Sequence, residues 1–201
     1  MNNFEENPKV IFTKIKHLLS LGVKDRNHTF HTPVFSTVNK EKLAESRVVV
    51  LRKFDEKNLK LNFHTDFRSP KIIDIKNNNL TSFVFYDSKI KIQIRIKSKS
   101  IIHNQNSTSQ EAWDKTRLFS RKCYLTKKSP SSLTDKAEDG IDIHLKGIDP
   151  TKDESEIGYN NFTVIENIIK NFDWLYLDSL GHRRLNINIK NSLPEFSWVI
   201  P

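Results

Sequence analysis

Residues 47–71 read RVVVLRKFDEKNLKLNFHTDFRSPK, and they combine two strand signals, a turn and a helix start in one short stretch. Val48–Leu51 is an apolar, mostly β-branched run between two arginines, which is typical of a buried strand. After a polar turn, residues 59–63 alternate between apolar and polar side chains and predict the antiparallel partner strand. The stretch therefore predicts a hairpin whose strand ends present positive charge.

The two arginines that flank the apolar run are Arg47 and Arg52, which stand five residues apart. On one continuous strand an odd spacing places two side chains on opposite faces of the sheet. The two arginines therefore serve different ligands, unless a β-bulge turns one of them toward the other.

A helix start closes the stretch. Ser69 is placed to cap a helix that has Pro70 at its first position and Lys71 in its first turn. A lysine at this end opposes the helix dipole, and it is tolerated where an anion binds to the helix start. Cations, hydroxyls and backbone N–H groups are therefore gathered as a phosphate group requires.

The composition points to one domain. The chain has 201 residues, of which 36% are hydrophobic, and this suits a single compact domain over residues 1–201. The N-terminal sequence MNNFEENPK has acidic residues and no apolar segment, so we expect no secretory signal and a cytoplasmic location. We also expect no membrane partner, because no stretch is long and apolar enough to span a bilayer.

Metal and nucleic acid are not expected as ligands. The single cysteine excludes an intrachain disulfide and a cysteine-rich metal site, and His64 and His182 have no partner at a metal-ligand spacing. The net charge of +9 permits nucleic-acid binding. The lysines are nevertheless spread along the chain among asparagines and isoleucines, which indicates a compositional habit rather than a binding patch.

The rest of the chain predicts short strands with a few helices. Apolar residues near helical spacing predict an amphipathic helix over Pro8–Leu21 that Gly22 ends, and a second helix signal runs from Ser109 toward Tyr124. Further strands are expected at residues 29–38, 80–86, 90–96, 161–169, 172–177, 183–189 and 196–201. This pattern predicts a mainly β, α+β protein built as an antiparallel barrel with flanking helices.

One segment lacks such a pattern. Residues 127–158 are rich in Lys, Ser, Asp, Glu and Gly and have little apolar periodicity. They predict a flexible surface loop or a lid within the single domain.

Three motifs in this chain resemble a known family. R-V-V-V-L-R, F-H-T-D-x-R-S-P-K and Q-I-R occur in the order of the pyridoxamine 5'-phosphate oxidase-like family of FMN-binding split β-barrels, most closely a branch that carries HTD-x-RSPK. The resemblance runs from about Phe30 to the C-terminus, apart from residues 127–158. It implies an antiparallel split β-barrel, FMN as the cofactor, and a homodimer with FMN at the subunit interface.

The resemblance also implies a set of FMN-binding residues, which come from the early motifs and from the C-terminal part of the chain. They are Arg47, Val48, Val49, Val50, Leu51, Arg52, His64, Thr65, Arg68, Ser69, Lys71, Gln93, Trp174 and Arg184. Pro70 and Lys71 stand at the positions of an Arg-Lys pair that the family has at the phosphate. Pro70 carries no charge, so Arg68, two residues earlier, is the expected replacement for the missing cation. Trp174 and Arg184 keep the family's ten-residue separation, although core packing explains Trp174 equally well.

The substrate positions match the family less closely. In the family, the helix that follows the strand with the flavin-contacting glutamine supplies a tyrosine, an arginine and a serine to the substrate phosphate. The counterparts in this chain, after Gln93, are Ala112, Thr116 and Ser120. The substrate-binding candidates are Arg52, Arg117, Ser120 and His182, of which Arg117 is one place out of register. Leu180 stands where the family has an arginine two residues before His182.

Three hypotheses for the function follow. The first is an FMN-dependent oxidoreductase that acts on a small molecule and uses His182 or Arg184 to stabilise the negative charge of reduced flavin. The second is a non-catalytic protein that stores or senses FMN, which the altered substrate positions favour. The third is a basic nucleic-acid-binding barrel, whose affinity would fall steeply with salt.

Overall fold

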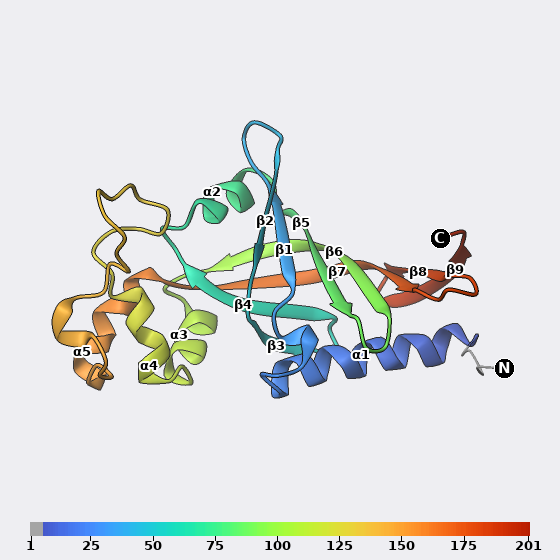
Figure 1. Cartoon of the computed structure of the whole chain (residues 1–201), viewed down its shortest axis with the longest axis horizontal. Helices are drawn as coiled ribbons and strands as arrows, with labels where there is room; N and C mark the ends of the chain where they lie inside the picture. Colours follow the sequence, from blue (N-terminus) through green and yellow to red (C-terminus); the bar gives the residue numbers. More distant parts are fainter. Residues whose placement is uncertain (1–5) are drawn as a thin grey trace.

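The computed structural model describes residues 6–201 and contains one antiparallel sheet with helices around it (Figure 1). Residues 1–5 begin the acidic stretch that predicts no secretory signal, and they lie outside the described part. The strands are β1 (Val34–Val38), β2 (Ala44–Val48), β3 (Leu51–Asp55), β4 (Lys60–Asp66), β5 (Leu80–Asp87), β6 (Ile92–His103), β7 (Phe162–Tyr176), β8 (Arg183–Lys190) and β9 (Leu193–Val199).

The sheet is not closed. Its strand order is β2-β1-β5-β6-β7-β4-β3, and β8 and β9 extend it from β7. Every strand pair in residues 6–201 is antiparallel, and β2 and β3 lie at the two ends of the order without pairing to each other. The predicted mainly antiparallel β architecture with flanking helices is confirmed, in an open form.

The helices occupy distinct places around the sheet. They are α1 (Pro8–Lys24), α2 (Pro70–Asn77), α3 (Ser107–Asp114), α4 (Leu118–Arg121) and α5 (Lys152–Glu156). Figure 1 shows α1 along one side of the sheet, and α3, α4 and α5 together at the end opposite the β8–β9 hairpin. In the part of the chain that is described, no helix is long and apolar enough to cross a membrane.

The core lies between α1 and the inner face of the sheet. Ile15 and Leu19 of α1 pack among phenylalanines of the strands, of which Phe35, Phe83 and Phe172 are fully buried. A second, smaller cluster forms where α3 meets β7: Trp113, Tyr124, Phe162 and Val164. At about 25 cal/mol per Å² of buried apolar surface, these large side chains are the main source of stability.

Several predicted elements differ from the structure because contacts distant in sequence override the local pattern. The apolar run Val48–Leu51 is not one strand: β2 ends at Val48 and β3 begins at Leu51, so the run connects the two strands that stand first and last in the strand order. The strand predicted at residues 29–38 begins at Val34, after one turn of 3₁₀ helix. The helix signal at Ser109–Tyr124 divides into α3, α4 and a 3₁₀ turn.

Residues 127–158 contain helices that the sequence pattern did not predict. Thr151 and Glu154 form a reciprocal capping box at the start of α5, and 3₁₀ turns lie on both sides of this helix. The buried Lys122 donates hydrogen bonds from Nζ to the carbonyls of Leu145 and Ile148, at 3.1 and 2.7 Å. The flexibility expected for this segment stays a prediction.

The prediction that Gly22 ends α1 is wrong, because α1 continues to Lys24 and Gly22 lies inside it. A Cβ atom added at Gly22 would lie 2.7 Å from the carbonyl oxygen of Phe30. The Gly22 carbonyl also lies 2.7 Å from Nδ1 of His31. The close approach of α1 to the turn that follows it therefore requires glycine at this position.

Gly22→Ala is expected to lower the free energy of unfolding by about 1–3 kcal/mol, because the atoms that a methyl group would meet belong to backbone. In an ordinary helix interior the same change stabilises by roughly 0.5–1 kcal/mol. Urea denaturation measures the difference, with Ser20→Ala on α1 as the control. A Gly22→Ala protein as stable as wild type would contradict the close packing.

Candidate functional site

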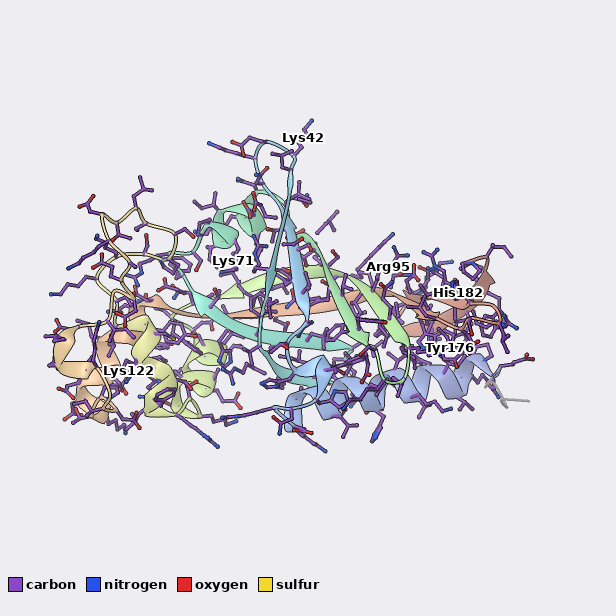
Figure 2. The ribbon with its side chains drawn as sticks, viewed as in Figure 1. Lys42, Lys71, Arg95, Lys122, Tyr176 and His182 are labelled. Carbon is purple, nitrogen blue, oxygen red and sulfur yellow. The ribbon has the colours of Figure 1, made fainter. Side chains whose placement is uncertain are left out.

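The first group of predicted site residues gathers where α2 meets the sheet, around Lys71 (Figure 2). We call it the Lys71 cluster, and its members are Thr37, Arg47, Thr65, Lys71 and Asp74. Lys71 Nζ donates to Thr65 Oγ1 at 3.0 Å, and Arg47 Nη1 donates to Thr37 Oγ1 at 2.8 Å. Asp74 accepts a hydrogen bond from Thr37 at 2.7 Å and lies 3.9 Å from Nη2 of Arg47.

The electrostatics of the Lys71 cluster favour an anion. Burial lowers the pKa of Lys71, and the neighbouring positive charge of Arg47 lowers it further. The hydrogen-bond partner of the ammonium group is the neutral hydroxyl of Thr65. The two half-buried cations share the carboxylate of Asp74, and that of Asp66 also acts on Lys71. A phosphate group between the cations would supply further negative charge and acceptor oxygens.

The start of α2 has the predicted form. Ser69 is the N-cap residue and Pro70 is at the first helical position. The side chain of Ser69 makes no capping hydrogen bond and is 2% exposed. Pro70 has no backbone N–H, and the Ile72 N–H donates to the Ser69 carbonyl at 2.9 Å. The backbone N–H of Lys71 is therefore the group at the helix start that can donate to an anion beside the Lys71 ammonium.

Arg68 is engaged elsewhere. Its guanidinium donates to both carboxylate oxygens of Asp66, at 3.0 and 2.7 Å, and to the backbone carbonyl and side chain of Thr126, at 2.9 and 3.1 Å. These bonds attach residue 126 to the end of β4. Arg47 and Lys71 are consequently the cations that the structure places together at the start of α2.

Arg52 lies apart from Arg47. The pairing of β3 with β4 shifts between Leu51 and Lys53, which marks a β-bulge or irregularity at Arg52. That this irregularity re-aims the arginine stays a prediction. The apolar run Val48–Leu51, which precedes Arg52, is not buried throughout: Val48 is 62% exposed, whereas Leu51 is 1% exposed. The two arginines stand on β2 and β3, at opposite ends of the strand order.

Arg52 opens onto a cavity of about 330 Å³ between the sheet and α3. We call it the Arg52 cavity; its lining is Arg26, Arg52, Lys53, Asn62, His64, Thr108, Glu111, Ala112, Lys115, Thr116, Arg117, Ser120 and Val164. The structure thus brings the predicted residues Arg52, His64, Arg117 and Ser120 together. Sequence reasoning missed Arg26 and Lys53, because no local motif links them to the helix that carries Arg117.

His64 is a neutral imidazole in this cavity at physiological pH. Burial lowers its pKa from 6.5 to about 4, and the positive charge of Arg52 contributes to the shift. The ring packs edge-on against Phe162, with 4.8 Å between ring centroids. A neutral imidazole can donate one hydrogen bond and accept another, so His64 suits a polar ligand beside the arginine.

The third group lies on the outer face of the sheet, opposite the core. We call it the open sheet face: Gln93, Arg95, Asp173 and Arg184, which strand register places in neighbouring rows. Arg184 donates to both carboxylate oxygens of Asp173, at 3.0 and 2.7 Å, and Arg95 binds the same carboxylate. The two arginines lower the pKa of Asp173, against the opposing effect of its burial.

Trp174 is not on the open sheet face. It pairs in register with Ile94 and Leu185, is 5% exposed, and stacks at 6.3 Å on Tyr176. Arg184 pairs with Leu175, so the tryptophan and the arginine project from opposite faces of the sheet. Within one chain this placement favours the core-packing interpretation of Trp174.

His182 lies in the turn before β8, as predicted. Its Nδ1 accepts a hydrogen bond from the backbone N–H of Asp178 at 3.1 Å. Figure 2 shows His182 near the β8–β9 hairpin and Lys71 beside α2, well separated along the molecule. One chain therefore does not bring the late predicted residues to the Lys71 cluster.

Residues 13–104 match the family described as pyridoxamine 5'-phosphate oxidase, FMN-binding domain. The predicted family resemblance is thereby confirmed. The matched segment contains Arg47, Lys71 and Gln93, and it ends before α3.

Solved structures share the fold over nearly the whole chain. A pyridoxamine 5'-phosphate oxidase-related, FMN-binding protein from Nostoc punctiforme has a TM-score of 0.73 and 16% identity, covering 98% of this chain and 100% of that one. PhzG from Burkholderia lata 383, in complex with tetrahydrophenazine-1-carboxylic acid, has a TM-score of 0.71 and 13% identity, with coverage of 100% and 95%. A protein related to general stress protein 26 from Clostridium acetobutylicum has a TM-score of 0.60 and 10% identity, with coverage of 93% and 100%. No curated protein sequence matches this chain significantly.

Proposed function

We propose that this protein binds FMN and is an FMN-dependent oxidoreductase. The observation that carries the proposal is the Lys71 cluster, in which two half-buried cations and a hydroxyl lie at a helix start without a side-chain cap, within a segment that matches an FMN-binding family. Bound FMN would supply the two-electron flavin chemistry. The protein's own residues bind and orient the cofactor and set the charge around it.

The donor set fits the cofactor. Arg47 and Lys71 would hold the phosphate, helped by Thr65 and the backbone N–H of Lys71 at the start of α2. Gln93 can donate and accept at the polar edge of the flavin ring. Arg184 carries the positive charge that would offset negative charge on reduced flavin, and its bonds to Asp173 hold the guanidinium in place.

The substrate is proposed to bind in the Arg52 cavity. Arg52, Arg117 and Ser120 line it with the neutral His64, and this set suits a small molecule with an anionic group. The named ligand of the Burkholderia lata neighbour is also a carboxylic acid, tetrahydrophenazine-1-carboxylic acid. A reductive screen tests catalysis: the absorbance of bound flavin is followed under anaerobic conditions while pyridoxamine phosphate, pyridoxine phosphate or a nicotinamide nucleotide is added.

A specific observation favours a second candidate, an FMN-binding protein without catalysis. Ala112, Thr116 and Leu180 stand at positions where the family has substrate-binding side chains. A protein that takes up FMN tightly but is bleached by none of these reductants would support storage or sensing.

We further propose a homodimer with FMN at the subunit interface. His182 lies well away from the Lys71 cluster (Figure 2), and register places Gln93 and Arg184 on the open sheet face. A second copy of the chain would bring these residues to the Lys71 cluster of its partner. The open sheet face is suited to this contact because exposed apolar side chains border its charged residues, among them Val48 at 62% and Tyr86 at 49% exposure.

Tyr86→Asp is expected to make the protein monomeric and to weaken FMN binding at least about tenfold, because a charge would be buried at the proposed interface. Light scattering measures the mass, and flavin fluorescence measures the affinity. Leu133→Asp is the control, since Leu133 is 96% exposed in the segment of residues 127–158, away from the sheet. A wild-type protein that is monomeric and keeps full FMN affinity on dilution would disprove the dimeric site.

A further inference from the structure

The Arg52 cavity holds more positive charge than one phosphate group needs. Its lining contains five cations from three separate segments of the chain: Arg26, Arg52, Lys53, Lys115 and Arg117. The one carboxylate in the lining is Glu111, and it is bound to Lys115 at 2.6 Å.

The arginines of this cavity are also unusual in their lack of ion pairs. In residues 6–201, Arg26, Arg52 and Arg117 have no carboxylate within ion-pair distance, and neither has Lys53. Five other arginines each lie within ion-pair distance of a carboxylate: Arg47, Arg68, Arg95, Arg121 and Arg184. The chain has 24 acidic residues, so the unpaired state of the cavity does not reflect a shortage of carboxylates.

The cavity is separate from the Lys71 cluster. His64 and Thr65 are consecutive residues of β4, and their side chains therefore project to opposite faces of the strand. His64 lines the cavity, whereas Thr65 binds Lys71. Within residues 6–201, a phosphate held by the Lys71 cluster thus leaves Arg26, Arg52 and Arg117 without a carboxylate or phosphate partner within ion-pair distance.

We propose that the Arg52 cavity binds a small molecule with at least two anionic groups, of which a diphosphate is the simplest. The inference rests on the proposed function in taking this ligand as the substrate of the flavin site. Arg52, Arg117 and Ser120 suffice for one anionic group, and Arg26 and Lys53 add two cations for a second. The hydroxyls of Thr108 and Thr116 supply further donors to phosphate oxygens.

The size and lining of the cavity favour a small molecule over a nucleic acid. A volume of about 330 Å³ is near the lower limit of small-molecule sites, which is roughly 300 Å³. Single-stranded nucleic acid is usually held by aromatic side chains that stack on its bases. Apart from the imidazole of His64, no aromatic ring lines this cavity.

Calorimetric titration with pyrophosphate and with orthophosphate tests the proposal on the full chain, with and without FMN. Wild type is expected to bind pyrophosphate at least about tenfold more tightly than orthophosphate, because the second phosphate group adds charge-assisted hydrogen bonds. The variant Arg26→Gln/Lys53→Gln is expected to lose this preference and to keep its melting temperature and FMN affinity. The control Lys14→Gln/Lys57→Gln makes the same change in net charge outside the cavity, and it should keep the preference.

Three results would overturn the inference: equal affinity for the two phosphates, an equal loss of preference in the control variant, or a single-stranded oligonucleotide that displaces pyrophosphate and binds more tightly. A failure to bind FMN would instead contradict the proposed function. The two failures are distinguishable because the pyrophosphate preference is also measured without FMN.

Discussion

Lys71→Met is expected to weaken FMN binding by about 10- to 100-fold. The ammonium group lies at the start of α2, half-buried, with a neutral hydroxyl as its hydrogen-bond partner, and a hydrogen bond to a charged group contributes roughly 1.5–3 kcal/mol. Methionine keeps most of the apolar stem and removes the charge. Riboflavin, which has no phosphate, should bind equally weakly to wild type and variant, and quenching of flavin fluorescence measures both ligands.

Lys76→Met is the matched control for this prediction. Lys76 stands in the last turn of the same helix, where its ammonium lies 4.7 Å from the ring centroid of Phe67. The substitution changes the net charge equally but leaves the helix start intact. If both variants lose the same FMN affinity, or if wild type binds riboflavin as tightly as FMN, the phosphate does not bind to the Lys71 cluster.

His64→Gln is expected to remove a large part of the acid sensitivity of folding. The pKa of His64 is about 4 in the folded protein against an ordinary 6.5, so between these values the unfolded chain binds a proton that the folded protein does not. The contribution of His64 to the free energy of unfolding is therefore fully present above pH 6.5. It is lost as the pH decreases to about 4, where His64 of the folded protein also becomes protonated. The shift corresponds to roughly 3 kcal/mol.

Urea denaturation at several pH values between 4 and 7 measures this loss. The His64→Gln protein should show a flatter dependence of the unfolding free energy on pH than wild type. His17→Gln controls for the removal of one histidine, because His17 is exposed on α1. A variant whose pH dependence is as steep as that of wild type would show that His64 is not the group responsible.

Local patterns in the sequence predicted the parts of the fold that depend on near neighbours. The alternation at residues 59–63 and the isoleucines of residues 90–96 mark strands, and Ile94 and Ile96 are fully buried as their alternation requires. Ser69 and Pro70 mark the start of α2. These signals succeed because turn geometry, capping and side-chain alternation act over a few residues.

Side-chain partners distant in sequence were not predictable in this way. The motif gives no sign that Arg68 binds Asp66 and Thr126. The spacing of Trp174 and Arg184 placed both at the flavin, yet the register of β7 with β8 puts them on opposite faces of the sheet. Register depends on how whole strands pair, and a single-residue shift would exchange the two faces.

The sequence by itself determined the family resemblance, the antiparallel β architecture and the cationic helix start at Lys71. Each of these depends on a continuous motif or on a short repeat of side-chain types. Only the tertiary structure decided that the Val48–Leu51 run connects the two strands that stand first and last in the strand order. It also decided that Arg26, Lys53 and Arg117 share one cavity, in which His64 is neutral. The physical reason is that charge, burial and cavity shape arise from segments that meet only after the chain has folded.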